Sequence, residues 1–214
     1  MNGRWTKTTF DGLGRAVKVE SGDSSGSGGS AVTKSIVETE YDSCACTPVG
    51  KVKRVSQPYA PGGAVNWTTN TYDGLGRTTR VDLPAGTGFS TYAYTGNVVT
   101  KTDPAGRWKK YTMDAMGNLV KVTEPNPAGG ADLDSTYAYN VLNKLTTVTM
   151  VRGGVTQTRT FVYNSDQRLQ SVTQPETGTT TFDYNADGTM LRKTDAKGQK
   201  TQYGYDDKQR SRRC

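Results

Sequence analysis

The sequence predicts an all-β protein built as an array of antiparallel β-hairpin repeats that form a curved sheet. Two observations predict this class. A short motif recurs in unequal copies along the whole 214-residue chain: in its full form it is an aromatic residue or Met, then Asp or Asn, then Gly after two further residues. Thr and aromatic residues alternate before the motif, and no stretch of ten or more residues has helical periodicity. A unit of roughly twenty to thirty residues cannot bury an apolar face alone, so the units must be stabilised by their neighbours.

The first residue of the motif, which we call the anchor, keeps a common register along the chain. The nine anchors are Phe10, Tyr41, Tyr72, Tyr94, Met113, Tyr139, Tyr163, Tyr184 and Tyr205. The motif residues that follow and that we single out are Asp11, Gly14, Arg15, Asp42, Asp73, Gly76, Arg77, Asp114, Gly117 and Asp206. The copy at Tyr41 carries an insertion of five residues, and the copy at Tyr94 reaches its glycine two residues early. All three tryptophans, Trp5, Trp67 and Trp108, lie five residues before an anchor, which supports the register.

Each repeat is expected to contain a strand, a turn, a return strand and a second turn. Segments such as 136–139 (TYAY) and 160–163 (TFVY) alternate with period two, which predicts a strand with its aromatic pair on one face. In the next four residues, Asp or Asn caps a turn with its side chain, and Gly supplies a left-handed conformation. The return strand carries Leu or Val, as in 119–122 and 169–172, and ends near a proline.

Composition and the chain ends limit the architecture further. Only 33% of the residues are hydrophobic, and the 25 glycines lie largely in turns, so a thick two-sided core is not expected. We expect one repeat region of about nine units over residues 1–214, truncated at both ends, with a flexible Gly/Ser-rich loop at 21–30. Residues 210–214 do not continue the pattern, so no return strand is expected after the last turn.

The candidate chemistry of the chain is sparse. The sequence has no histidine, which excludes Ser-His-Asp, Cys-His and His-ligated metal sites within it. Most carboxylates follow an anchor, where a turn role suffices, so no catalytic, cofactor or metal residue is predicted and the chain is not expected to be an enzyme. Gly12-Leu13-Gly14 resembles a nucleotide loop but lacks a following helix. Cys44 and Cys46 could share a metal, pair with cysteines elsewhere, or lie in a turn insertion without chemistry.

The charge and hydropathy of the chain predict no nucleic-acid partner and no membrane span. The net charge of +7 comes from scattered Lys and Arg, which is typical of a solvated face. Acidic glycans or a membrane surface are the alternative partners for this charge. No apolar stretch of eighteen residues occurs, and no signal peptide begins this sequence.

The repeated motif resembles that of the RHS-repeat proteins, also called YD-repeat proteins. Residues 72–77 (YDGLGR) and 10–15 (FDGLGR) match the Tyr-Asp-x-x-Gly-Arg signature of the family, and the resemblance extends over nearly the whole chain. It implies a segment of a larger bacterial, secreted or cell-surface protein. In that family, hairpins wind into a hollow shell that encloses a C-terminal toxin or effector domain. The implied partners are therefore the remaining repeats and that domain.

Two further expectations accompany this resemblance. The family carries an Asp-Pro-x-Gly motif tied to self-cleavage, and the nearest string here is 103–106, but Arg107 replaces the expected apolar continuation. We therefore interpret Asp103 as a turn aspartate. The alternative function is a binding module, in which exposed aromatic and basic side chains engage glycans or a partner. Its candidate glycan-stacking residues are Trp5, Trp67 and Trp108.

Overall fold

The computed structural model describes residues 3–24, 31–44, 47–205 and 211–213, and these residues form an all-β fold. They contain eighteen strands and a single turn of 3₁₀ helix at Pro84–Gly86. Every strand pairing with a defined register is antiparallel, and it joins strands that follow one another along the chain. The predicted all-β array of antiparallel hairpins is confirmed.

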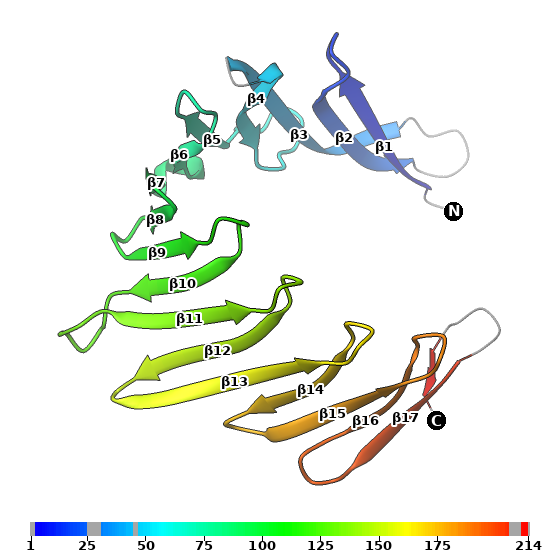
Figure 1. Cartoon of the computed structure of the whole chain (residues 1–214). Coiled ribbons are helices and arrows are strands. Elements are labelled where there is room, and N and C mark those ends of the chain that lie inside the picture. The colour runs from blue at the N-terminus through cyan, green and yellow to red at the C-terminus, as the bar shows by residue number, and fades with distance from the viewer. Residues whose placement is uncertain (1–2, 25–30, 45–46, 206–210, 214) are drawn as a thin grey trace. The chain divides into compact units, whose positions relative to one another are not determined.

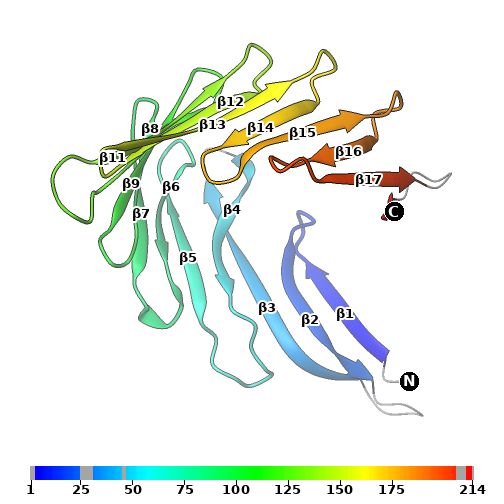
Figure 2. The ribbon, with the colours of Figure 1, turned by 90° about the horizontal axis from the view of Figure 1, so that it is seen from below.

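The chain divides into two compact units, and the first comprises described residues of Met1–Thr95 together with Val99–Trp108. Its strands are β1 (Gly3–Phe10), β2 (Ala16–Ser24), β3 (Ala31–Cys44), β4 (Thr47–Ser56), β5 (Trp67–Tyr72), β6 (Thr78–Asp82) and β7 (Phe89–Thr95). Strand β8 (Val98–Thr102) begins at the edge of the second unit and continues in the first. Strands β1 to β7 pair successively in chain order, as Figure 2 shows.

The second unit comprises Gly96–Val98 and the described residues from Lys109 onward. Its strands are β9 (Trp108–Met113), β10 (Leu119–Glu124), β11 (Leu133–Tyr139), β12 (Leu145–Arg152), β13 (Val155–Tyr163), β14 (Leu169–Gln174), β15 (Gly178–Tyr184), β16 (Met190–Thr194), β17 (Lys200–Tyr205) and β18 (Ser211–Arg213). These strands also pair in chain order, and β10 to β16 lie side by side in Figure 1.

A β-bulge recurs at the same place in the anchored hairpins. In the hairpin of β11 and β12, Ala138 pairs with Thr147 and the anchor Tyr139 pairs with Leu145, so Thr146 is an extra residue without a partner. The register shifts in the same way beside Phe10, Tyr41, Tyr72, Met113, Tyr163 and Tyr184. A bulge bends the return strand and disrupts the ladder locally. The carbonyl groups on either side of it therefore become available to partners outside the hairpin.

Little of the described chain is buried. Ile36 and Val172 are the buried hydrophobic residues, and Ser56 and Ser135 are the buried polar residues of the described part. Most strand residues are half-buried on both faces of a single layer. Since apolar burial is the main stabilising term in ordinary domains, contacts between neighbouring hairpins carry unusual weight here.

Two of the expected boundaries are wrong. Strand β2 continues through Ser24, which pairs with Gly3, so the first four residues of the predicted loop 21–30 belong to a strand. Residues 25–30, Cys46 and Asp206 lie outside the described residues. At the other end, β18 pairs with β17 through Tyr205 and Ser211, so a short return strand follows the last anchor. Within the part of the chain that the structure describes, no helix is long and apolar enough to cross a membrane.

Candidate functional site

The recurring feature of the structure is the corner, by which we mean the five residues from the Asp or Asn after an anchor to the residue after the Gly. At Asp73 the backbone N–H donates to the carbonyl of Arg77 at 2.9 Å, and the N–H of Gly76 donates to the carbonyl of Asp73 at 2.9 Å. Gly76 has a φ of 74°. This is the pattern of a type I turn followed by a left-handed residue, a common three-residue hairpin connection.

The aspartate side chain holds the corner from inside. Oδ1 of Asp73 accepts the N–H groups of Leu75 and Arg77 at 3.0 and 2.9 Å, and Oδ2 accepts Nε of Arg77 at 2.7 Å. Asp11, Asp103, Asp114, Asn140, Asn164 and Asp195 bind the N–H groups two and four residues ahead in the same way. The residue type at this position is thus explained by turn formation, and Asp103 is a turn aspartate.

These hydrogen bonds lower the pKa of the corner aspartates. For Asp73, the largest contribution comes from the backbone N–H of Arg77, and the Arg77 side chain and the N–H of Leu75 act in the same direction. The pKa of Asp11 is lowered by the same groups of Arg15, again with the backbone N–H first. Hydrogen bonds donated to the ionised carboxylate favour that form. Asp11 and Asp73 are therefore held as structural anions.

Tyrosine anchors join each hairpin to the one before it. The hydroxyl of Tyr163 donates at 3.0 Å to the carbonyl of Leu145, the sixth residue after the preceding anchor. Six more tyrosine anchors do the same at 2.7 to 3.2 Å, with the insertion allowed for, and their acceptors are Ala16, Val52, Thr78, Leu119, Leu169 and Met190. We call this hydrogen bond the tyrosine latch. Its acceptor lies beside the bulge, where the ladder leaves a carbonyl free.

The residue after the corner glycine adds a second link to the same neighbour. The guanidinium of Arg15 lies 4.3 Å from the ring centroid of Tyr41, and that of Arg77 lies 4.3 Å from the ring of Tyr94. The cations of Lys51 and Arg168 lie 5.7 and 5.8 Å from the rings of Tyr72 and Tyr184. Such cation–π contacts contribute about 0.5–1 kcal/mol at exposed sites. Arg15 and Arg77 thus each bind the aspartate of their own corner and stack on the next anchor.

The predicted glycan-stacking tryptophans have protein neighbours. The guanidinium of Arg54 lies 4.2 Å from the ring centroid of Trp67 and also forms two hydrogen bonds with Glu40, at 2.6 and 2.7 Å. One face of Trp67 is therefore covered by a side chain. The indole nitrogen of Trp5 is buried without a hydrogen-bond partner. A glycan-stacking role for Trp5, Trp67 and Trp108 stays a prediction.

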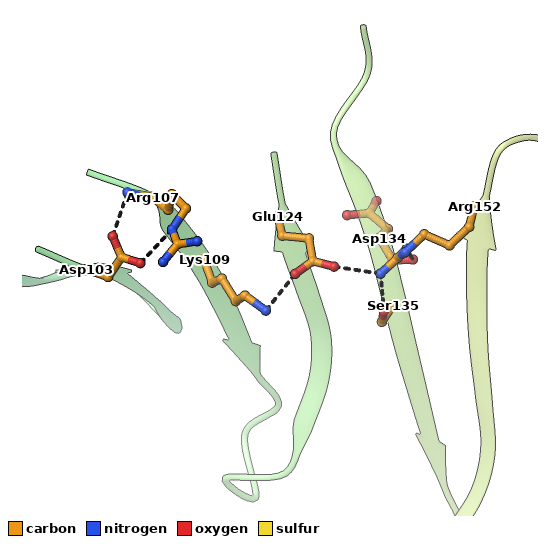
Figure 3. A network of polar contacts seen from close by, with 7 residues as sticks. All are labelled: Asp103, Arg107, Lys109, Glu124, Asp134, Ser135 and Arg152. Carbon is orange, nitrogen blue, oxygen red and sulfur yellow. Dashed lines mark hydrogen bonds and ion pairs between the residues drawn. The ribbon is translucent and has the colours of Figure 1, made fainter. Parts of the chain in front are cut away.

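A network of polar contacts crosses strands β9 to β12 in the second unit, as Figure 3 shows. Glu124 lies between two cations: Lys109 Nζ is 2.7 Å and Arg152 NH2 is 2.8 Å from its carboxylate oxygens. Arg152 also donates to the hydroxyl of Ser135 and to the carbonyl of Asp134. The pKa of Glu124 is lowered, and the hydrogen bond from the Lys109 side chain is the largest cause. Burial acts in the opposite direction, and the charges of Lys109 and Arg152 lower the pKa further. Each charged side chain of this network lies beside one of opposite sign, and the two cations share the single Glu124 carboxylate, which is the arrangement of a structural brace.

The sequence predicted the corner and missed the links between corners. Phe10, Asp11, Gly14 and Arg15 lie together as an anchor and its corner, and so do Tyr72, Asp73, Gly76 and Arg77, whereas Asp42 lies in strand β3 opposite Lys51 and Asp206 lies outside the described residues. The repeat pattern does not predict that the anchor hydroxyl binds the preceding hairpin or that Arg15 and Arg77 stack on the next anchor. A signal was present, because seven of the nine anchors are Tyr while only one is Phe. The described residues hold no group of three or more His, Cys, Asp or Glu that could bind a metal.

Part of the repeat region matches a known family of repeats. The RHS Repeat family model matches residues 163–199, which cover two anchored hairpin corners and the strands between them. The resemblance to RHS-repeat proteins is confirmed. No curated protein matches the sequence.

Solved structures of Tc toxin components share this fold at low sequence identity. A crystal structure of TcdB2-TccC3-Cdc42 aligns with 98% of the chain at 15% identity and a TM-score of 0.71. The TcdB2-TccC3 structure without its hypervariable C-terminal region aligns with 95% at 14% identity and a TM-score of 0.70. The Photorhabdus luminescens Tc holotoxin pore aligns with 96% at 16% identity and a TM-score of 0.53. The chain spans 12 to 13% of the length of these matched chains.

Proposed function

We propose that this chain is a structural wall segment of an RHS-like bacterial protein that is secreted or displayed at the cell surface. The observation that carries the proposal is the tyrosine latch, which joins a tyrosine hydroxyl to the equivalent carbonyl of the preceding hairpin at all seven tyrosine anchors. A binding or catalytic site is assembled once, from residues that differ in role. Here a tyrosine at the same position of seven units binds the preceding hairpin, as expected of an array whose units stabilise their neighbours.

The wall would enclose a toxin or effector domain that belongs to the same longer polypeptide. Support comes from the matched RHS repeat and from the Tc toxin structures, one of which is described as lacking a hypervariable C-terminal region. The enclosing role does not require chemistry from this chain. The partners proposed are the remaining repeats and the enclosed domain, with no cofactor.

The test begins with the gene sequence on both sides of these residues and continues with the native full-length polypeptide. We expect repeats to continue in both directions and to end in an unrelated C-terminal domain that resists added protease in the intact protein. The domain should become sensitive once the wall is unfolded with denaturant. A C-terminal domain that is cut equally fast in both states would contradict enclosure.

A glycan-binding result would favour the alternative function. Retention of the wild-type chain on heparin and on neutral glycans is compared with that of Trp5→Ala and Trp108→Ala. The structural proposal predicts weak retention that salt abolishes, because scattered Lys and Arg bind anions only through screened charge. Salt-insensitive retention that either substitution abolishes would show a binding module.

A further inference from the structure

The tyrosine latches join the hairpins into two separate runs. The first run links the hairpins of Phe10, Tyr41, Tyr72 and Tyr94, and the second links the hairpins from Met113 through Tyr205. The anchor that opens each run, Phe10 or Met113, has no hydroxyl and therefore cannot form a latch to a preceding hairpin.

A different contact occupies the latch position at Met113. The corner after Tyr94 is shortened to Gly96 and Asn97, so it carries no cation at the position from which Arg15, Lys51, Arg77 and Arg168 stack on the next anchor. Asn97 Nδ2 donates to the carbonyl of Met113 at 2.5 Å, and the N–H of Met113 donates to the carbonyl of Asn97 at 3.0 Å. Both residues belong to the second compact unit, so these bonds stabilise that unit internally.

The runs and the compact units coincide. Tyr94 is the last anchor of the first unit, and Met113 is the first anchor of the second. The compact units are defined by which backbone segments lie close together, and the runs are defined by side-chain hydrogen bonds. The two independent features place the boundary between the same two anchors. In a linear repeat array, the free energy of folding is approximately the sum of the stability of each repeat and the interaction energies between neighbouring repeats. A junction with a weaker interaction energy is therefore where cooperative folding units separate.

We propose that the two latched runs are separate cooperative folding units and that the missing hydroxyl at anchor 113 sets the boundary between them. Loss of one latch should then weaken every hairpin of its own run and leave the other run unchanged. The proposal depends on the hydrogen bonds of this chain and is independent of whether a toxin or effector domain is enclosed.

Native-state hydrogen exchange of the whole chain, measured by mass spectrometry of peptides, tests the proposal. Tyr163→Phe removes a latch of the second run, and Tyr72→Phe removes one of the first. Tyr137→Phe and Tyr92→Phe are matched controls, because neither hydroxyl has a hydrogen-bond partner among the described residues. For Tyr163→Phe we expect the slowest amides of β10 to β17 to exchange about fivefold faster, with β1 to β7 unaffected. Tyr72→Phe should give the reverse.

Three outcomes would overturn the proposal. Equal acceleration in both runs would show one cooperative array. Acceleration confined to the mutated hairpin and its direct neighbour would show that a run is not cooperative. An effect no larger than that of the control substitutions would show that the latch hydroxyl does not couple hairpins at all.

Discussion

Asp73 shows how a single residue of the motif acts in this protein. Its carboxylate accepts three hydrogen bonds from two residues of its own corner and so holds the turn together. The residue types of the motif follow from this geometry. A short carboxylate reaches the two N–H groups of the turn, Gly accepts the left-handed backbone, and Arg returns to the carboxylate.

We predict that acid weakens the corners through Asp11 and Asp73. Their pKa values are lowered in the folded state, so the stabilisation they give is complete above the usual Asp value of about 3.9 and is lost as the pH falls through the lowered value. The carboxyl carbon of Asp73, followed by NMR, should titrate below the usual range. Because the backbone N–H of Arg77 is the largest cause, Arg77→Ala should restore the pKa only in part. Full restoration would contradict this order of causes.

Gln167 is a position where substitution should stabilise the protein. It occupies the corner position of the glycine with a φ of 62°, and its side-chain oxygen is buried without a hydrogen-bond partner. A left-handed backbone costs a non-glycine residue about 1–2 kcal/mol. We expect Gln167→Gly to raise the free energy of unfolding by about 1 kcal/mol in urea titrations.

The matched control for Gln167→Gly is Ser165→Gly in the same corner, where φ is not positive. It should give no gain, because glycine there only adds freedom to the unfolded chain. Equal gains from both substitutions would show that strain at Gln167 is not the cause.

At the scale of the strand, the network around Glu124 ties β9, β10 and β12 together across the sheet (Figure 3). We predict that Glu124→Gln lowers the free energy of unfolding by about 1 kcal/mol at low salt, since two cations lose their partner in a site that solvent partly screens. The loss should shrink at high salt. Urea titrations at two salt concentrations measure both effects.

Glu176→Gln serves as the comparison for the Glu124 network. Glu176 pairs with the single cation Arg159 and its side chain is 47% exposed, whereas that of Glu124 is 25% exposed. We therefore expect a smaller loss at Glu176. An equal or larger loss would show that the network adds nothing beyond an isolated surface pair.

The elements were predictable from the sequence to the extent that they depend on local chemistry. Alternation before Tyr139 and Tyr163 predicted strands, and Asp with Gly predicted the turns, because both rules act within a few residues. The bulge beside each anchor was not predicted, since it follows from the turn geometry and from the partner strand together. The short strand β18 was missed because Ser211–Arg213 lacks the apolar residues of the other return strands and pairs through its backbone.

On the scale of the whole chain, the repeated contacts between neighbouring hairpins are the main source of stability. Buried apolar side chains are few in the described residues, and the tyrosine latch recurs along each run, joined by a cation–π contact at Tyr41, Tyr72, Tyr94 and Tyr184. The tyrosine latch was not predicted because it joins residues of different hairpins, and a repeat pattern alone does not reveal which neighbour a side chain touches. Each tyrosine anchor binds the hairpin that precedes it in the chain, so the latch has one direction along each run.

We predict that removing the hydroxyl of a latched tyrosine lowers the free energy of unfolding more than removing the hydroxyl of a tyrosine that forms no latch. Tyr184→Phe should lower the free energy of unfolding by about 1 kcal/mol, because the carbonyl of Leu169 loses its donor while the ring is retained. Tyr111→Phe, which changes an aromatic residue two positions before an anchor, should change it by a few tenths of a kcal/mol. Equal losses would mean that the hydroxyl is dispensable.

Electron cryo-microscopy of the native full-length polypeptide tests the central claim most directly. The account predicts that these hairpins lie in a continuous wall with the strand order and tyrosine latches described above, and that a separate domain of the same chain lies within that wall. A full-length protein whose additional domains all lie outside the wall, or one in which these hairpins pair with different strands, would contradict it.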